Sequence, residues 1–387
     1  MRRKNGFIKG ALCGALTMLI VVMIFDILFS GGRSILEDST EKKLSTIRRL
    51  IDAEYLYADE ITEQILNEST IKGYVEGLGD PYSVYYDAEE TKNLMESTSG
   101  EFGGIGVTLT QDIDTMVISF TNVYEESPGE KAGFKSGDIL YKVDGEEVTG
   151  QDLDHVVSKI RGEKGTEVEL TILRGDEMEE YTGTAIRDII EVTTVSHEML
   201  EDSIGYIAVS GFEKVTYHQF EEAIVDLTTQ GMKGLIVDLR NNPGGNLSTV
   251  CEMTDLLLPE GIIVYTEDRN GNKQTEMSDE EHQLNVPLAV LVNGNSASAS
   301  EIFAGAIQDY GVGKIVGTTT YGKGIVQQIY SLSDGTALKI TTSEYFTPNG
   351  RNIHGKGIVP DIVIEYEYDE MNPESDNQLQ AAIESLK

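Results

Sequence analysis

The sequence predicts an α/β protein in which a helical region and a small β-rich domain precede a larger layered core. Apolar residues recur at helical spacing in residues 34–98, and residues 99–187 change to short β-type runs separated by glycine turns. In residues 188–366, strand-like apolar runs alternate with amphipathic helical segments. This alternation is typical of α/β layers. The expected domains are a basic start with an anchor at 1–31, a helical region at 32–98, a β-rich domain at 99–187, and a core with its C-terminal tail at 188–387.

The N-terminus has the pattern of a membrane anchor. Four basic residues lie between positions 2 and 9, and an apolar run follows at residues 11–29, broken only by Asp26. As a helix this run spans about 28 Å, which is close to the thickness of a bilayer core. The alternative is a cleaved signal peptide, but residues 27–31 offer no small-x-small cleavage site. We expect a retained single-pass anchor with the N-terminus in the cytoplasm and the body outside.

The region before the β-rich domain is expected to be helical. Asp38 and Glu41 have the spacing of a capping box, and apolar residues follow on one face. A second helical pattern at residues 71–78 ends before the sequence Gly79-Asp80-Pro81. These helices are expected to pack beside a larger domain.

The β-type segments at 99–187 suit a small, partly open barrel. Strands are expected at 103–109, 115–120, 139–143 and 167–173, with one helix at 153–160. The domain opens with a glycine-rich entry into its first strand. The backbone N–H groups of such a loop can turn toward a carboxylate, although turns also use glycine for purely conformational reasons. The residues of this loop are Gly103, Gly104, Ile105, Gly106 and Val107.

Strands and helices are expected to alternate through the core. The expected strands are 204–209, 234–239, 288–292 and 315–317, and the expected helices are 220–227, 247–258 and 298–308. Residues 372–387 form an acidic tail with a helical pattern.

Composition excludes several function classes. The formal net charge is −36, which argues against a nucleic-acid partner because phosphate binding needs clustered Lys and Arg. The two cysteines cannot build a disulfide framework, because Cys13 lies in the apolar run and Cys251 in an amphipathic segment. Leu12, before Cys13, is too large for a lipoprotein site. The five histidines show no metal-binding spacing, so we expect no metal and no cofactor.

Ser298 and Lys323 each stand in a local sequence that suits catalysis. Ser298 follows a β-type run at the expected start of a helix, with Glu301 three residues later. A plain helix cap explains this pattern equally well. Because a helix N-terminus presents unpaired N–H groups, the N–H of Ala299 can also stabilise an oxyanion beside Ser298. A serine hydroxyl needs a base, and a buried neutral lysine such as Lys323 can serve as one.

A second oxyanion donor is expected at the end of a buried strand. Residues 234–239 run into the turn Asn242-Pro243-Gly244-Gly245, and sites in α/β sheets lie at the carboxyl ends of strands. Either glycine can supply the second N–H group, although the motif also fits an ordinary tight turn.

Several motifs in order resemble the carboxy-terminal processing proteases, also called tail-specific proteases. The match covers nearly all of the chain after the anchor, and each motif is weak by itself while the ordered set is specific. The matching segments are 77–83, the glycine-rich loop at 103–107, 127–138, 238–245, 296–301, 321–327, 347–350 and 355–361.

The resemblance implies a crotonase-like α/β protease core with an inserted PDZ domain. It assigns Ser298 as nucleophile, Lys323 as general base and Gln327 as the residue that orients the lysine. Backbone N–H groups of Ala299 and of the Gly244–Gly245 turn would be the oxyanion donors. The implied partners are proteins with free, apolar C-termini, bound by the PDZ domain, and homodimerisation is left open.

The expected function is therefore that of a membrane-anchored serine endopeptidase. One alternative is a membrane-tethered PDZ scaffold that binds C-termini without cleaving them, but a scaffold would not need Ser298, Lys323 and Gln327 together. A second alternative is a crotonase relative that handles acyl-CoA, for which the PDZ segment and the anchor have no use.

Overall fold

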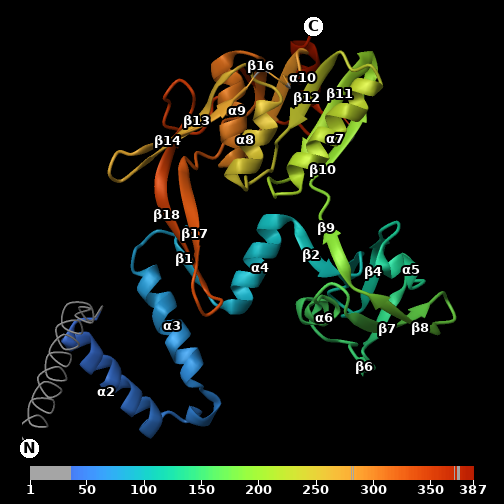
Figure 1. The fold of residues 1–387 in the computed structure, drawn as a ribbon. Helices are drawn as coiled ribbons and strands as arrows, with labels where there is room; N and C mark the ends of the chain where they lie inside the picture. Colours follow the sequence, from blue (N-terminus) through green and yellow to red (C-terminus); the bar gives the residue numbers. More distant parts are fainter. Residues whose placement is uncertain (1–35, 280, 282, 370, 373–374) are drawn as a thin grey trace, which may run out of the picture. The chain divides into compact units, whose positions relative to one another are not determined.

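The computed structural model describes residues 36–279, 281, 283–369, 371–372 and 375–387 (Figure 1). The chain divides into two compact units, Met1–Ile71 and Lys72–Lys387. Across the described residues, no helix has both the length and the apolar character that crossing a bilayer requires. The anchor predicted at residues 11–29 lies outside the described residues.

The helices and strands follow one another in mixed order along the chain. The helices are α2 (Asp38–Glu54), η1 (Ala58–Glu60), α3 (Glu63–Glu76), α4 (Ala88–Ser99), α5 (Pro128–Lys131), α6 (Leu153–Ile160), η2 (Glu201–Ser203), α7 (Thr216–Thr229), α8 (Leu247–Asp255), α9 (Ala299–Tyr310) and α10 (Asn377–Ser385). The strands are β1 (Val84–Tyr86), β2 (Glu101–Gly104), β3 (Val107–Gln111), β4 (Ile118–Val123), β5 (Ile139–Val143), β6 (Glu146–Glu147), β7 (Glu167–Arg174), β8 (Glu179–Ile186), β9 (Asp188–Glu191), β10 (Val195–Met199), β11 (Ile204–Val209), β12 (Gly234–Asp238), β13 (Gly261–Asp268), β14 (Lys273–Ser278), β15 (Leu288–Val292), β16 (Gly313–Gly317), β17 (Ile325–Ser331), β18 (Ala337–Phe346) and β19 (Ile362–Val363).

The described residues of the first unit, from 36 on, form helices that bury little of their own surface. No residue of α2 is buried, and apolar residues such as Ile47 and Leu50 are exposed. The capping box predicted from Asp38 and Glu41 is wrong. The N-cap is Glu37, whose side chain makes no capping hydrogen bond, and Asp38 and Glu41 instead supply negative charge to the first helical turn.

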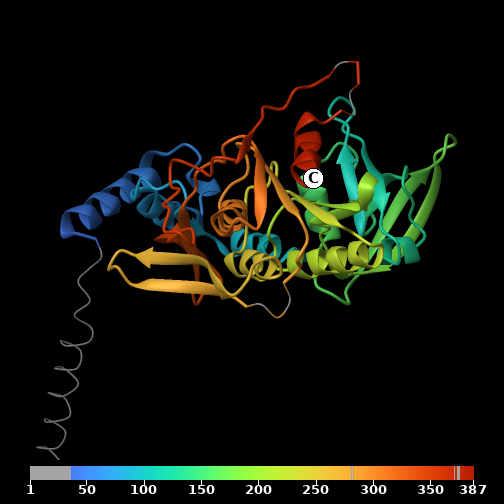
Figure 2. The ribbon, with the colours of Figure 1, turned by 90° about the horizontal axis from the view of Figure 1, so that it is seen from above.

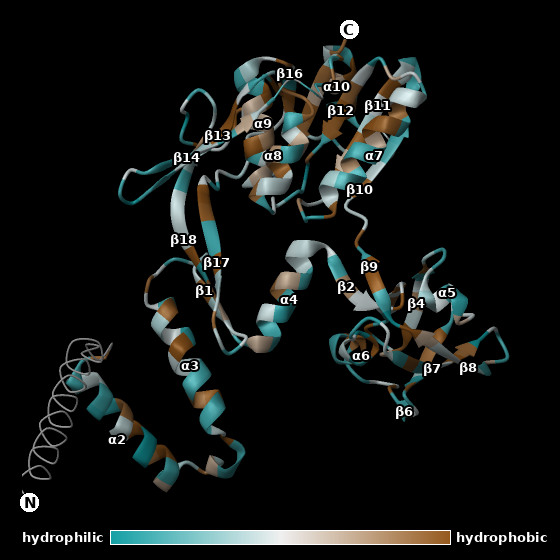
Figure 3. Ribbon diagram, viewed as in Figure 1, coloured by the Kyte–Doolittle hydropathy of each residue, from teal (hydrophilic) through white to brown (hydrophobic). Residues whose placement is uncertain are grey.

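A six-stranded sheet forms the centre of the core, in the order β10-β11-β12-β15-β16-β19. The strand β10 is antiparallel to β11, and the remaining neighbours are parallel. All residues of β12 and β15 are buried, as is expected for parallel strands covered on both faces. The strand β12 accordingly carries the hydrophobic colour in Figure 3.

Helices cover both faces of this sheet. Leu235, Val237 and Val290 join the large apolar cluster formed with α7, α8 and α9. Ile236 and Ala289 point the other way, into a smaller cluster with α10. Figure 2 shows α7 and α8 on one side of the strands and α10 on the other. This alternation fixes the register, because a slip by one residue would exchange the two sets of side chains.

A second, antiparallel sheet runs in the order β1-β18-β13-β14. The strand β17 also pairs with β18, outside this order. The long β17–β18 ladder carries the segment that follows Lys323, and β1 places the residues after Pro81 beside β18 (Figure 1).

The small β-rich domain has its own apolar core. Its sheet runs β3-β4-β5-β7-β8, with β6 on β5, and the buried residues Phe120, Phe134 and Leu170 lie inside it. Arg187 is buried and donates to the carbonyls of Lys159 and Ile160, which closes the C-terminal end of α6.

Candidate active site

Ser298 stands at the N-terminus of α9 in a strained backbone conformation. Its φ and ψ are 56° and −112°, a region that non-glycine residues rarely adopt and that costs about 1–3 kcal/mol. Contacts on both sides hold it there. Glu301 Oε2 accepts from the Ser298 N–H at 2.9 Å, and the Tyr345 hydroxyl donates to the Ser298 carbonyl at 3.0 Å. A backbone held in this way presents the side chain at a fixed angle, as in the strained turns that carry other nucleophilic serines.

The neighbouring serines have structural roles instead. Ser296 and Ser300 are fully buried. Ser296 Oγ donates to the Leu239 carbonyl at 2.8 Å, and Ser300 Oγ donates to the Asn242 carbonyl at 3.0 Å. Ser298, by contrast, lines a cavity of about 660 Å³. Of these three serines, only Ser298 presents its side chain to a cavity that can hold a substrate.

Glu301 joins the serine to the lysine loop. Its carboxylate is fully buried and accepts from four donors. Oε2 accepts from the N–H groups of Ser298 and Lys323, the latter at 2.8 Å, and Oε1 accepts from Gly322 N–H and Thr320 Oγ1. One rigid carboxylate thus fixes the backbones of both expected catalytic residues.

The glycines on either side of Lys323 allow close packing against a distant segment. A Cβ atom on Gly322, whose φ is 89°, would lie 2.9 Å from the N atom of Lys356. A Cβ on Gly324 would lie 2.7 Å from the N atom of His354. The Gly-Lys-Gly sequence is therefore a steric requirement of the loop.

Lys323 lies in a partly desolvated setting beside the same cavity. Burial lowers the pKa of its ammonium group, the nearby charge of Lys339 lowers this pKa further, and Asp80 acts in the opposite direction. Nζ lies 4.6 Å from the centre of the Tyr82 ring. Within the described chain Nζ donates no hydrogen bond to Ser298 or Gln327, although all three residues line the cavity. Such contacts often close only when substrate binds.

Two of the three predicted oxyanion donors are available. Within the described residues, the N–H groups of Ala299 and Gly245 donate to no other protein group, whereas Gly244 N–H donates to Asn242 Oδ1 at 2.8 Å. This narrows the prediction to Ala299 and Gly245. Gly244 has a different role: a Cβ on it would lie 2.8 Å from Ser298 Cβ, so only glycine permits the turn to approach the serine.

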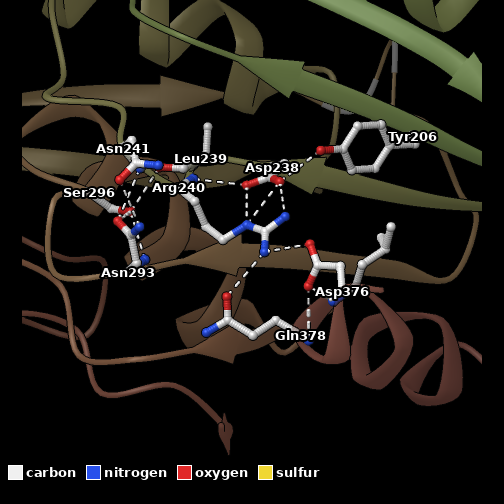
Figure 4. Close-up of polar contacts among 10 residues, drawn as sticks. Tyr206, Asp238, Leu239, Arg240, Asn241, Asn293, Ser296, Asp376 and Gln378 are labelled. Atoms are coloured by element: carbon white, nitrogen blue, oxygen red, sulfur yellow. Dashed lines mark hydrogen bonds and ion pairs between the residues drawn. The ribbon is translucent and has the colours of Figure 1, made fainter. Parts of the chain in front are cut away.

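A polar network holds the turn after β12 in place (Figure 4). The Asn241 N–H donates to Asn293 Oδ1 at 3.0 Å, and Asn293 Nδ2 donates back to Asn241 Oδ1. Arg240 forms ion pairs with Asp238 and with Asp376, the N-cap residue of α10. The network links the turn after β12, the turn before Ser298 and the C-terminal helix.

Three parts of this chain match models of known protein families. Residues 203–364 match the model of peptidase family S41, residues 119–174 match a PDZ domain, and residues 31–91 match the N-terminal domain of the activating protease CtpB. A carboxy-terminal-processing protease of Bartonella bacilliformis is 39% identical over 85% of this chain and 76% of its own length. A probable CtpA-like serine protease of Staphylococcus epidermidis is 37% identical over 93% of this chain and 73% of its own.

This chain belongs to the carboxy-terminal-processing proteases of peptidase family S41.

The family membership confirms the resemblance read from the motifs, and it makes the chain a serine-type peptidase with a PDZ domain. The interpretation as a scaffold without proteolytic activity is therefore set aside. Among solved structures, a photosystem II D1 C-terminal processing protease aligns with a TM-score of 0.48 and 27% identity, over 82% of this chain and 88% of the other.

The PDZ domain of this S41 protease places the glycine-rich loop before an edge strand. Residues 105 and 106 lie between β2 and β3, and their N–H groups donate to no backbone carbonyl in the described chain. Gly103 and Gly104 are instead paired with β9, and Val107 begins β3. The donors able to face a bound carboxylate are thus concentrated at Ile105 and Gly106.

Sequence reasoning missed several residues of this S41 site. Glu301 was considered only as a cap, although a carboxylate so close to a nucleophile is a signal for a buried link. Asp80 and Tyr82 belonged to a matched motif but received no role. Thr341 and Tyr345 carry no local signal, because both lie on β18, far along the chain. Tyr345 lines the cavity, and Thr341 contacts Gln327 and Asp80.

Proposed function

We propose that this protein is a membrane-anchored endopeptidase that binds free, apolar protein C-termini through its PDZ domain and cleaves them with a Ser298–Lys323 dyad. The observation that carries the proposal is one shared cavity of about 660 Å³. Ser298, Lys323 and Gln327 line it together, and the N–H groups of Ala299 and Gly245 are unpaired within the described residues that border it.

The reaction proceeds by acyl transfer. Ser298 Oγ attacks the scissile carbonyl carbon while its proton passes to neutral Lys323 Nζ, and the oxyanion that forms accepts from Ala299 and Gly245 N–H. As the intermediate collapses, the C–N bond breaks and the Lys323 ammonium gives its proton to the leaving amine. Water then attacks the acyl-enzyme while Lys323 takes one of its protons. As the ester C–O bond breaks, Lys323 returns this proton to Ser298 Oγ, and the carboxylic acid product leaves.

The lysine can act as a base only in its neutral form. Burial lowers its pKa from the ordinary value, so the neutral fraction at a given pH is larger than for an exposed lysine. Activity should therefore rise with pH through one ionisation.

Two features support recognition of apolar tails. The strand β3 is an edge strand with α6 nearby, and a peptide can add to such an edge with its carboxylate at the glycine-rich loop. Apolar side chains border the catalytic cavity and suit an apolar residue next to the cleaved bond, among them Phe212, Leu247, Ile302 and Ile325.

The location and assembly are part of the same proposal. Basic residues before the apolar run at 11–29 support an anchor with the catalytic body on the extracytoplasmic side. The exposed apolar residues Leu44, Ile47 and Leu50 of α2 support a homodimer. Removal of residues 1–31 should release an active protein into the soluble fraction, and a fragment that stays with membranes would contradict the anchor.

The dyad is tested with Ser298→Ala and Lys323→Arg in a peptide cleavage assay. Arginine keeps the positive charge but does not release its proton at working pH, so both variants should show no turnover above background. Turnover by Lys323→Arg at more than a few per cent of the wild-type rate would overturn the assignment of the base.

A further inference from the structure

The turn between α3 and β1, although far from the other site residues in the sequence, contacts both β18 and Lys323. Asp80 stands in this turn and accepts three hydrogen bonds. Its Oδ2 accepts from Ser83 Oγ at 2.6 Å and from Thr341 Oγ1 at 2.7 Å, and its Oδ1 accepts from the Tyr82 N–H at 3.0 Å. The Thr341 N–H in turn donates to Ser83 Oγ at 3.1 Å. These hydrogen bonds therefore hold the Asp80 carboxylate against β18.

The hydroxyl of Thr341 connects this carboxylate to Gln327. Gln327 Nε2 lies 3.3 Å from Thr341 Oγ1. A hydroxyl has one proton, and a carboxylate can only accept, so the Thr341 proton is committed to Asp80. Thr341 must therefore accept from Gln327, which directs the amide NH₂ toward Thr341. The carbonyl oxygen of Gln327 is then the atom that can accept from Lys323.

The same turn also faces the lysine itself. Tyr82 places its ring 4.6 Å from Lys323 Nζ, a distance at which the ring face attracts a cation. The charged and titratable groups that face Lys323 are Asp80 and Tyr82 from this turn, Tyr321 from its own loop, Lys339 from β18, and Glu301, which holds its backbone N–H. Of the groups acting on its charge, Lys339 disfavours the ammonium and Asp80 favours it.

Asp80 itself remains a carboxylate over the working range. Burial alone would raise its pKa, but the hydrogen bonds from Ser83, Thr341 and the Tyr82 N–H, together with the charge of Lys323, hold this pKa below the usual value. It can therefore orient and stabilise its neighbours without taking a proton, which is the part that the aspartate plays in a Ser-His-Asp triad.

We propose that Asp80 is a positioning residue of the dyad: through Thr341 it fixes the amide orientation of Gln327, and with the Tyr82 ring it stabilises the ammonium that Lys323 becomes. The proposal rests on the proposed function, because it assumes that Lys323 accepts the proton of Ser298. That proton moves from Ser298 Oγ to Lys323 Nζ and then to the leaving amine, and Asp80 carries none of it.

The pH dependence of kcat distinguishes this role from a structural one. In Asp80→Asn the charge that favours the ammonium is lost, so the pKa of Lys323 falls and the rising limb of the profile should move to lower pH by roughly 1 unit. Asparagine can also donate to Thr341, which frees that hydroxyl to donate to Gln327 and turn its amide. We expect kcat to fall roughly 10- to 100-fold with little change in KM.

Lys339→Met is the matched control for the charge effect. This substitution removes the charge that disfavours the Lys323 ammonium, so the rising limb of the pH profile of kcat should move to higher pH. Asp87→Asn is the control for general destabilisation of this segment, because Asp87 caps α4 and its loss should leave the limb in place. Asp80→Asn with an unmoved limb, or with a kcat within 3-fold of wild type, would overturn the proposal.

Variants of Thr341 test the relay if Asp80→Asn folds poorly. Thr341→Val removes the hydroxyl, and Thr341→Ser keeps it. We expect Thr341→Val to lose kcat roughly 10-fold or more and Thr341→Ser to retain it, both with the limb near its wild-type position because Asp80 keeps its charge. Equal kcat in the two variants would overturn the relay. Lys323→Arg distinguishes failure of the dyad from failure of the positioning role. If Lys323→Arg is active, the Ser298–Lys323 dyad is wrong. If it is inactive while the Asp80 and Thr341 variants behave as wild type, only the proposed role of Asp80 is wrong.

Discussion

At the scale of single residues, the site is organised by one buried carboxylate. Glu301 accepts hydrogen bonds from the backbone N–H groups of Ser298 and Lys323 and from the Thr320 hydroxyl. These contacts fix the backbone positions from which the Ser298 and Lys323 side chains extend. The carboxylate that caps α9 at the Ser298 N–H therefore also joins the two expected catalytic residues. The capping pattern was visible in the sequence, but the partners at 320–323 are supplied by the fold.

Glu301→Gln tests this link. A glutamine keeps the shape but turns an NH₂ group toward N–H donors, which leaves at least two buried donors without an acceptor at about 1–3 kcal/mol each. We expect the free energy of unfolding to fall by roughly 2–5 kcal/mol and kcat to fall at least about 100-fold. Denaturant unfolding and steady-state kinetics measure both. Wild-type kcat in a stably folded Glu301→Gln protein would contradict the link.

At the scale of helices and strands, sequence patterns predicted the elements whose own residues carry a clear apolar pattern. The helix α6 and the strands β5, β11 and β15 begin and end where the sequence predicted. The hairpin β13–β14 was missed although its turn contains Asn270-Gly271, a known hairpin signal. Its first strand is apolar at residues 262–265, but its second strand, β14, is polar and mostly exposed. The strand β18 was also missed, since its mixed residues make sense only between β13, β17 and β1.

The C-terminal helix was predicted from the sequence as part of an acidic tail, but its contacts with the core were not predicted. Asp376 caps α10 and pairs with Arg240 at 2.8 Å, and Arg240 also pairs with Asp238 next to the oxyanion turn. The tail is therefore part of the core, and its docking site lies beside residues that support the expected oxyanion donors.

Asp376→Ala should lower the free energy of unfolding by about 1–3 kcal/mol, because it removes a helix cap and one of the two carboxylates that pair with the largely buried Arg240 guanidinium. Glu384→Ala, on the exposed side of α10, is the matched control and should stay within about 0.5 kcal/mol of wild type. Urea unfolding of the three proteins makes the comparison. Equal midpoints for Asp376→Ala and Glu384→Ala would show that the Arg240 contact does not hold the helix.

At the scale of the whole molecule, the catalytic centre unites segments that no local pattern connects. The hydrogen bond from Thr341 to Asp80 joins residues 261 positions apart. Sequence motifs predicted Ser298, Lys323 and Gln327 individually, and the structure brings all three to one cavity. They did not predict which side chains would set the charge and orientation of the lysine, because those contacts depend on how β1 pairs with β18.

The PDZ domain gives a prediction about substrates. If the N–H groups at Ile105 and Gly106 bind the terminal carboxylate, amidation of a substrate's C-terminus removes the charge that they recognise. We expect kcat/KM to fall at least about 10-fold for the amidated peptide, with unchanged labelling of the enzyme by a serine-reactive probe. Equal cleavage of the amidated and free-acid peptides would show that the PDZ domain does not recognise the terminal carboxylate.

The central claim is that Ser298 is the nucleophile and Lys323 its base. The most direct measurement is mass spectrometry of the protein after reaction with a fluorophosphonate, with the labelling rate followed as a function of pH. The account predicts an adduct on Ser298 alone, a rate that rises with pH through one ionisation, and no labelling above background in Lys323→Arg. An adduct on Ser296 or Ser300, or labelling of Lys323→Arg at the wild-type rate, would contradict it.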